Sequence, residues 1–126
     1  MASERVGLDR LWRATGYSIA GFKAAWRHEA AFRQECALGI VLAPVAAWLG
    51  RSPLEYLVLV APLLIVLCVE LLNSAVEALT DRVGTEQNEL AGRAKDMGSA
   101  AVFVSLVLLA LCWGTVLWHR ALGTVM

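Results

Sequence analysis

The chain has 126 residues, of which 59% are hydrophobic, and its 11 basic and 11 acidic residues cancel to a formal net charge of zero. A mean hydropathy of +0.62 is far above that of a soluble globular domain. The length and composition therefore predict a membrane protein with a single domain over residues 1–126. Zero net charge and the lack of a basic patch with interleaved aromatic residues argue against a nucleic-acid partner.

Residues of about 5–28 are predicted to form an amphipathic helix on the membrane surface. Large residues recur there at helical spacing, at Leu8, Trp12, Thr15, Ile19, Phe22 and Trp26. Gly16 and Gly21 weaken this helix and are the points at which it would divide. The segment has no continuous apolar core of the signal-peptide kind, so we expect the N-terminus to be retained. The alternative is a basic tail that only orients the protein in the membrane.

Three later segments, at about 30–50, 53–83 and 89–120, are predicted to cross the membrane as helices. The clearest is 98–118, with 21 residues and no charge, close to the roughly 20 that cross about 30 Å of hydrocarbon. The first is weaker, because its apolar run covers only the 15 residues 36–50, and a re-entrant segment is the alternative. Pro44 and Pro62 are expected to bend their helices without ending them.

The basic residues predict the orientation. Six of the eleven Lys and Arg precede Gln34, and three more lie between Asp81 and Asp96. By the positive-inside rule, the N-terminus and the loop after the second span are cytoplasmic.

The ends of the second span have recognisable signals. Ser52 is placed as the N-cap, Pro53 as the first helical residue and Glu55 as the residue that closes a capping box. Gly84 is expected to end the helix in a left-handed conformation. A helix of about 30 residues is longer than the bilayer core, so its last turns would reach the cytoplasmic interface.

A row of polar residues follows one face of this span. Relative to Glu70, the residues Asn73, Glu77 and Asp81 fall at about −60°, −20° and +20°. Charges in a spanning helix are unfavourable and usually mark a functional site. A partly desolvated Glu70 would accept a proton from a lipid hydroxyl, and the better-hydrated Glu77 suits a hard cation such as Mg²⁺. For Asp81, a solvated helix end is an equal alternative.

Lys95 and Asp96 supply the cation that phosphates require and a carboxylate that orients it or binds metal through water. The usual nucleotide signatures are absent, since no GxxxxGK[ST] sequence and no protein-kinase motif set is present. No zinc or Ser-His-Asp pattern occurs, and Cys36, Cys68 and Cys112 are interpreted as packing residues. A phosphotransferase of this size must use another scaffold.

Three motifs together carry a family resemblance: Glu29-Ala-Ala-Phe-Arg-Gln-Glu35, Glu70-Leu-Leu-Asn-Ser-Ala-Val-Glu77 and Gly92-Arg-Ala-Lys-Asp-Met-Gly-Ser-Ala100. They closely resemble the bacterial integral-membrane diacylglycerol kinases, and the likeness covers nearly the whole chain. It implies an all-α homotrimer in the bacterial inner membrane, each subunit having a surface helix and three spanning helices, with active sites at subunit boundaries. The implied reaction is Mg²⁺-dependent transfer of the γ-phosphoryl group of ATP to diacylglycerol, which yields phosphatidate.

The resemblance also implies residue roles. Glu70 would be the general base, Glu29 and Glu77 would hold the metal, and Asn73 and Asp81 would support them. The nucleotide would be contacted by Arg10, Tyr17, Glu29, Glu77, Glu86, Gln87, Asn88, Lys95 and Asp96. The lipid would be contacted by Glu70 together with Arg10, Ala14, Thr15, Gly16, Tyr17, Ser18, Ile19, Ala31, Phe32, Arg33, Gln34, Glu35, Trp48, Ser99, Trp113 and Trp118.

Other functions compete with this interpretation. Undecaprenol kinases of Gram-positive bacteria share the fold and the core residues, so they differ in the lipid acceptor. A small proton-coupled transporter would use Glu70 as its coupling site but leaves Glu29, Lys95 and Asp96 without a role. A non-catalytic membrane assembly factor leaves the whole polar face unexplained.

Overall fold

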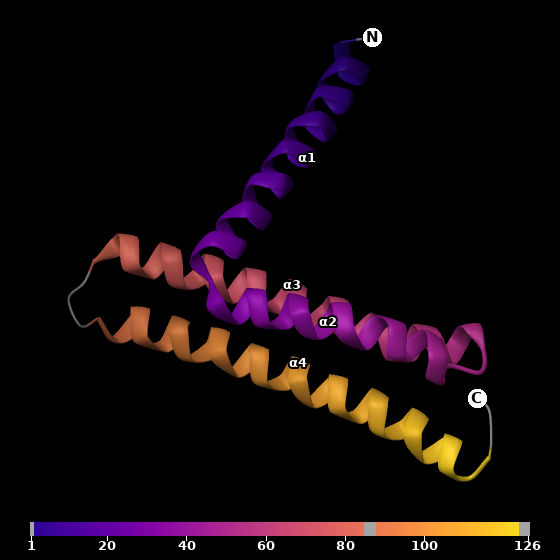
Figure 1. Ribbon diagram of the computed structural model, residues 1–126. Helices are drawn as coiled ribbons and strands as arrows, with labels where there is room; N and C mark the ends of the chain where they lie inside the picture. Colours follow the sequence, from indigo (N-terminus) through magenta and orange to yellow (C-terminus); the bar gives the residue numbers. More distant parts are fainter. Residues whose placement is uncertain (1, 85–87, 124–126) are drawn as a thin grey trace.

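A computed structural model describes residues 2–84 and 88–123, with side chains from Gly7 onward. It contains the helices α1 (Ala2–His28), α2 (Ala30–Leu49), α3 (Pro53–Val83) and α4 (Glu89–Ala121) (Figure 1). The last three are long and apolar enough to cross a membrane. The prediction of an all-α protein with three spanning helices behind an N-terminal helix is therefore confirmed.

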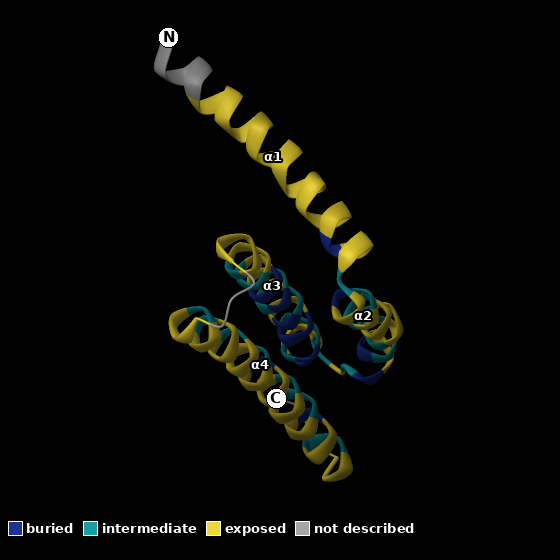
Figure 2. Ribbon diagram, turned by 90° about the vertical axis from the view of Figure 1, so that its left-hand side faces the viewer, coloured by how far each residue is buried: buried dark blue, intermediate teal, exposed yellow. Residues whose placement is uncertain are grey.

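The helices α2, α3 and α4 lie alongside one another, and α1 leans out of this bundle (Figure 1). The central helix is α3, which packs most extensively against α4 and less extensively against α2. Buried residues gather where α3 faces these two helices, and the outer faces are exposed (Figure 2). Large apolar side chains such as Leu64 and Phe103 are more than 60% exposed on those outer faces. Such surfaces suit contact with lipid.

The corner between α1 and α2 is a single residue. Glu29 has φ −117° and ψ 105°, which is extended backbone, while its neighbours on both sides are helical. The Arg33 guanidinium closes the corner by donating to the Trp26 carbonyl (2.7 Å) and to the Arg27 carbonyl (3.4 Å). The helix α1 runs without a break through Gly16 and Gly21, so it is not divided at these glycines.

Two of the predicted helix ends need correction. Ser52 Oγ accepts a hydrogen bond from the Glu55 N–H (3.1 Å), as the N-cap prediction required. The capping box is nevertheless not closed, because neither carboxylate oxygen of Glu55 has a hydrogen-bond partner among the described residues. Gly84 follows the last residue of α3 but has φ 164° and ψ 154°, so its backbone is extended rather than left-handed. Both α2 and α3 continue through Pro44 and Pro62, respectively.

The end of the bundle at the α2–α3 connection, here called the far end, holds its apolar core. Ala46, Leu49, Leu59 and Val116 form a buried cluster there. Two hydrogen bonds tie α4 to the other helices: Trp113 Nε1 donates to the Leu59 carbonyl (2.9 Å) and Arg120 Nη1 to the Leu49 carbonyl (2.5 Å). The Arg120 guanidinium also lies 5.4 Å from the centre of the Trp48 ring. These hydrogen bonds and the cation–π contact fix the axial position of α4 against α2 and α3.

Candidate functional site

The polar face of α3 changes from buried to exposed along the helix. Glu70 and Asn73 are buried at 5% and 9% exposure, Glu77 is half-buried, and Asp81 is exposed. The exposed end of the row is the end that leads into the connection to α4 (Figure 1). The burial gradient along these residues therefore has the direction expected for a helix that is longer than the bilayer core.

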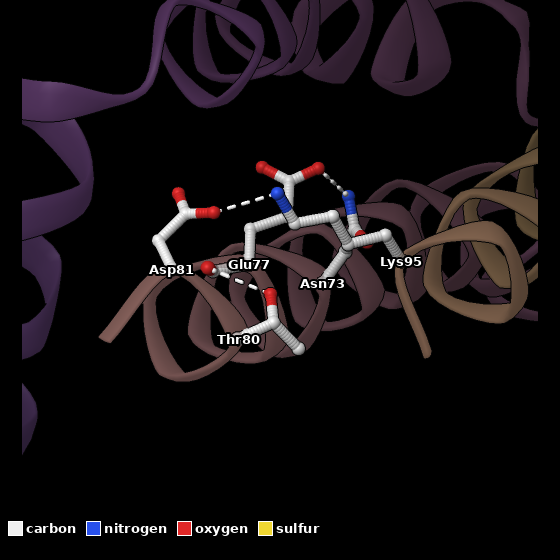
Figure 3. A network of polar contacts seen from close by, with 5 residues as sticks. All are labelled: Asn73, Glu77, Thr80, Asp81 and Lys95. Carbon is white, nitrogen blue, oxygen red and sulfur yellow. Dashed lines mark hydrogen bonds and ion pairs between the residues drawn. The ribbon is translucent and has the colours of Figure 1, made fainter. Parts of the chain in front are cut away.

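A hydrogen bond runs along this face within α3, and an ion pair connects the face to α4 (Figure 3). The Asn73 amide Nδ2 donates to Glu77 Oε1 at 3.5 Å, and Lys95 Nζ lies 2.6 Å from Asp81 Oδ1. The sequence offered Asp96 either as the carboxylate that orients the Lys95 ammonium or as a metal ligand through water, but the ion-pair partner of Lys95 is Asp81. Neighbouring residues on a helix point about 100° apart, so Lys95 pairs with a carboxylate on the facing helix instead.

The first turns of α2 and the corner before it bring two more carboxylates to the same region. The Glu35 carboxyl group lies within hydrogen-bonding reach of Glu70. The charges of Glu77 and Glu29 also act on Glu70, so each of them lies within electrostatic range of it. Glu35 Oε2 and Asn73 Oδ1 are buried with no hydrogen-bond partner among the described residues. The site thus has more oxygen acceptors than the described protein groups satisfy.

This donor set fits a magnesium ion that is bound together with phosphates. The described residues contain no group of three His, Cys, Asp or Glu side chains that could hold a metal by themselves. Mg²⁺ is usually bound by one or two carboxylates together with water and substrate phosphate oxygens, rather than by a complete protein cage. Glu29 and Glu77, both in electrostatic range of Glu70, are the carboxylates that would supply such a pair.

A cavity of about 500 Å³ lies between the second half of α1 and the face of α3 that carries Leu71 and Ser74. Ser18, Phe22 and Glu29 line it from one side, and Leu71 and Ser74 from the other. Its lining is mostly apolar, although Ser74 Oγ is buried without a hydrogen-bond partner among the described residues. Two of the predicted site residues, Ser18 and Glu29, therefore line a cavity beside the polar face of α3.

Other predicted residues are spread along the molecule. Arg10, Tyr17 and the rest of 14–19 are exposed along α1, which leans away from the bundle, while 31–35 form the first turns of α2. Ser99 is exposed on α4, and Trp48, Trp113 and Trp118 lie toward the far end. One chain by itself does not bring these positions into one groove.

The connection between α3 and α4 contains the remaining predicted positions. Glu86 and Gln87 lie outside the described residues. Asn88 is the N-cap of α4, and its Oδ1 accepts hydrogen bonds from the N–H groups of Leu90 (2.9 Å) and Ala91 (3.2 Å). The sequence analysis missed this cap, although an Asn directly before a helical segment is a recognisable signal.

The fold and the site together define a small helical membrane protein with a carboxylate-rich polar site at the end of its bundle opposite the apolar core. The family model described as prokaryotic diacylglycerol kinase matches residues 16–117. The chain belongs to this family, and it is an enzyme of the kinase class.

Individual relatives agree with the family match. A diacylglycerol kinase of Pseudomonas aeruginosa is 53% identical over 113 residues, which are 90% of this chain and 92% of the relative. Those of Haemophilus influenzae and Escherichia coli K12 are 46% and 44% identical, over 89% and 95% of this chain and over 95% and 98% of their own lengths. The similarity therefore covers the polar site and all three spanning helices.

Proposed function

We propose that this chain is a diacylglycerol kinase that transfers the γ-phosphoryl group of ATP to the free hydroxyl of diacylglycerol, forming phosphatidate and ADP. The proposal places it in the bacterial inner membrane with the N-terminus in the cytoplasm. The named relatives and the polar face of α3 support this assignment together. The observation that carries it is the contact of Lys95 on α4 with Asp81, at the end of the carboxylate-bearing face of α3. Phosphoryl transfer to a lipid needs a base near apolar surface and cations near phosphate.

Glu70 is the general base in this proposal. It is 5% exposed and lies deeper in the bundle than Glu77 or Asp81, where a lipid hydroxyl at the membrane edge can meet it. Its carboxylate takes the hydroxyl proton while the lipid oxygen forms a bond to the γ-phosphorus. The bond between that phosphorus and the bridging oxygen of ADP breaks, and ADP leaves with its electron pair. Glu35, within hydrogen-bonding reach, orients this carboxyl group.

Glu77 and Glu29 would hold the divalent metal, and Lys95 and Asp96 would contact the nucleotide phosphates. A bound Mg²⁺ would neutralise charge on the phosphate oxygens. Asn73 keeps the Glu77 carboxylate turned toward the site through its amide N–H. Lys95 adds a positive charge that is independent of the metal.

The proposed assembly is a homotrimer with sites between subunits. Arg10 and Tyr17 are exposed on a helix that leans away from the bundle of its own chain. Nucleotide contacts by these residues therefore favour a site completed by a neighbouring subunit. The exposed lipid-contacting positions of α1 and α4 are explained in the same way.

A radiolabelled ATP assay in mixed micelles tests the function, with diacylglycerol and undecaprenol offered separately. We expect label in phosphatidate and little in undecaprenyl phosphate. Label in undecaprenyl phosphate alone would replace the lipid acceptor while keeping the kinase mechanism. Label in neither lipid would contradict the proposal and favour a proton-coupled transporter.

A further inference from the structure

The ion pair between Asp81 and Lys95 joins α3 to α4 at the exposed end of the polar face (Figure 3). The distance from Lys95 Nζ to Asp81 Oδ1 is 2.6 Å, although the two side chains are 44% and 66% exposed. Exposed pairs contribute little to stability, because water screens them and two long side chains must be ordered. A short, ordered pair at this position is therefore better explained by the placement of the lysine than by the stability of the bundle.

The pair leaves the ammonium available to a ligand. An ammonium group has three N–H donors, and Asp81 uses one of them. The Glu77 carboxylate, one helical turn before Asp81, is close enough for its charge to act on the same ammonium. The Lys95 ammonium is thus held beside the proposed metal ligand, and two of its N–H donors have no hydrogen-bond partner among residues 2–84 and 88–123, which leaves them for phosphate oxygens.

We propose that Asp81 is a positioning residue that orders the Lys95 side chain for the nucleotide phosphates before they bind. The inference rests on the proposed function, in which Lys95 contacts these phosphates. A free lysine side chain loses rotamer freedom when a ligand immobilises it, which weakens binding. Because Asp81 has already ordered this side chain, ATP binding does not have to immobilise it, and the loss of side-chain entropy on binding is smaller. Asp96 cannot order the Lys95 side chain in this way, since it follows Lys95 on the same helix and its side chain points in another direction.

The test uses the full-length protein in lipid micelles and compares Asp81→Asn with wild type. We expect the KM for ATP, and the Kd of a fluorescent ATP analogue, to rise about fivefold, while kcat changes by less than about twofold. Asp81→Glu keeps the charge and should recover most of the affinity. Glu89→Gln is the matched control, because it removes an exposed carboxylate at the start of α4 that is not part of the pair, and it should leave both values unchanged.

Lys95→Met separates this inference from the proposed function. If Lys95 contacts phosphate, Lys95→Met weakens analogue binding, and adding Asp81→Asn to it has no further effect. Normal binding by Lys95→Met would remove Lys95 from the nucleotide site and contradict the proposed function itself. Weak binding by Lys95→Met with unchanged or tighter binding by Asp81→Asn would overturn the positioning role alone. A thermal unfolding shift in Asp81→Asn with no change in analogue Kd would likewise show a purely structural pair and overturn it.

Discussion

Gly98 of α4 packs against the side chain of Asn73 on α3 so closely that a Cβ atom at position 98 would overlap the Asn73 amide oxygen. The same Asn73 amide donates through its nitrogen to Glu77. The absence of a side chain at Gly98 therefore allows α4 to approach the polar face of α3 where the proposed metal ligand lies. Small residues have this effect generally between helices in membranes.

Gly98→Ala should force the Asn73 amide to rotate, because the added methyl group takes the place of its oxygen. The hydrogen bond to Glu77 is then lost, and we expect the free energy of unfolding to fall by about 1 kcal/mol. Thermal unfolding in micelles measures this change. In an Asn73→Ala background the methyl group has room, so the additional loss should disappear. An equal loss in both backgrounds would show that the methyl group clashes with the helix backbone instead.

Glu70→Gln should reduce lipid phosphorylation by about a hundredfold or more while the protein still assembles, because the amide cannot accept the hydroxyl proton. The radiolabel assay measures the turnover, and size-exclusion chromatography checks the assembly. Glu55→Gln is a matched control, since it makes the same change at another buried glutamate of α3, near the far end. Near-normal turnover in Glu70→Gln would remove Glu70 as the base.

Glu77→Gln should raise the Mg²⁺ concentration needed for half-maximal activity by about tenfold or more, the usual scale for a weakened metal site. The loss of one of two carboxylate ligands is the physical reason. The shift should also appear without turnover, as weaker Mg²⁺-dependent protection against thermal unfolding in the presence of an ATP analogue. An unchanged Mg²⁺ titration in both experiments would exclude Glu77 from the metal site.

Glu55→Leu should stabilise the protein. The Glu55 side chain is fully buried at 0% exposure, and its oxygens have no hydrogen-bond partner among the described residues. Burial of an unpaired polar group is unfavourable by about 1 to 3 kcal/mol, so an apolar side chain of similar size should raise the free energy of unfolding by about 1 kcal/mol or more. Activity should be unchanged, because Glu55 is distant along α3 from the polar face.

Ser52→Ala is the companion to that experiment. It removes the hydroxyl that accepts the Glu55 N–H and should lower the free energy of unfolding by about 1 kcal/mol. If Ser52→Ala lowers the free energy of unfolding and Glu55→Leu raises it, the stabilising effect of the backbone cap is distinguished from the unfavourable burial of the carboxyl group. A large destabilisation by Glu55→Leu would mean that the carboxyl group has a favourable partner in the assembled protein.

Features that depend on neighbouring residues in the sequence could be predicted. The spanning helices followed from long apolar runs, the Ser52 cap from a local signal, and the shared face of Glu70 and Glu77 from helical spacing. Each needs only the geometry of one helix. Family membership followed from three short motifs, because their combination and spacing are specific.

Features that depend on how α4 returns beside α3 could not be predicted. The pairing of Lys95 with Asp81 and the contact of Gly98 with Asn73 both require the relative rotation and axial position of the two helices. Helical periodicity alone does not provide these quantities. The burial of Glu55 was missed for a similar reason, since a glutamate at this helix position is usually solvated unless other helices cover it.

Because the corner between α1 and α2 is the single residue Glu29, the number of residues at this point determines how α1 is rotated relative to α2. A helix turns by about 100° per residue, so one inserted or deleted residue beside Glu29 would rotate the whole of α1 about its own axis by that angle relative to α2. The faces carrying Arg10 and Tyr17 would then point elsewhere, even with every side chain retained. Position 29 thus sets the rotational phase between the N-terminal helix and the spanning bundle.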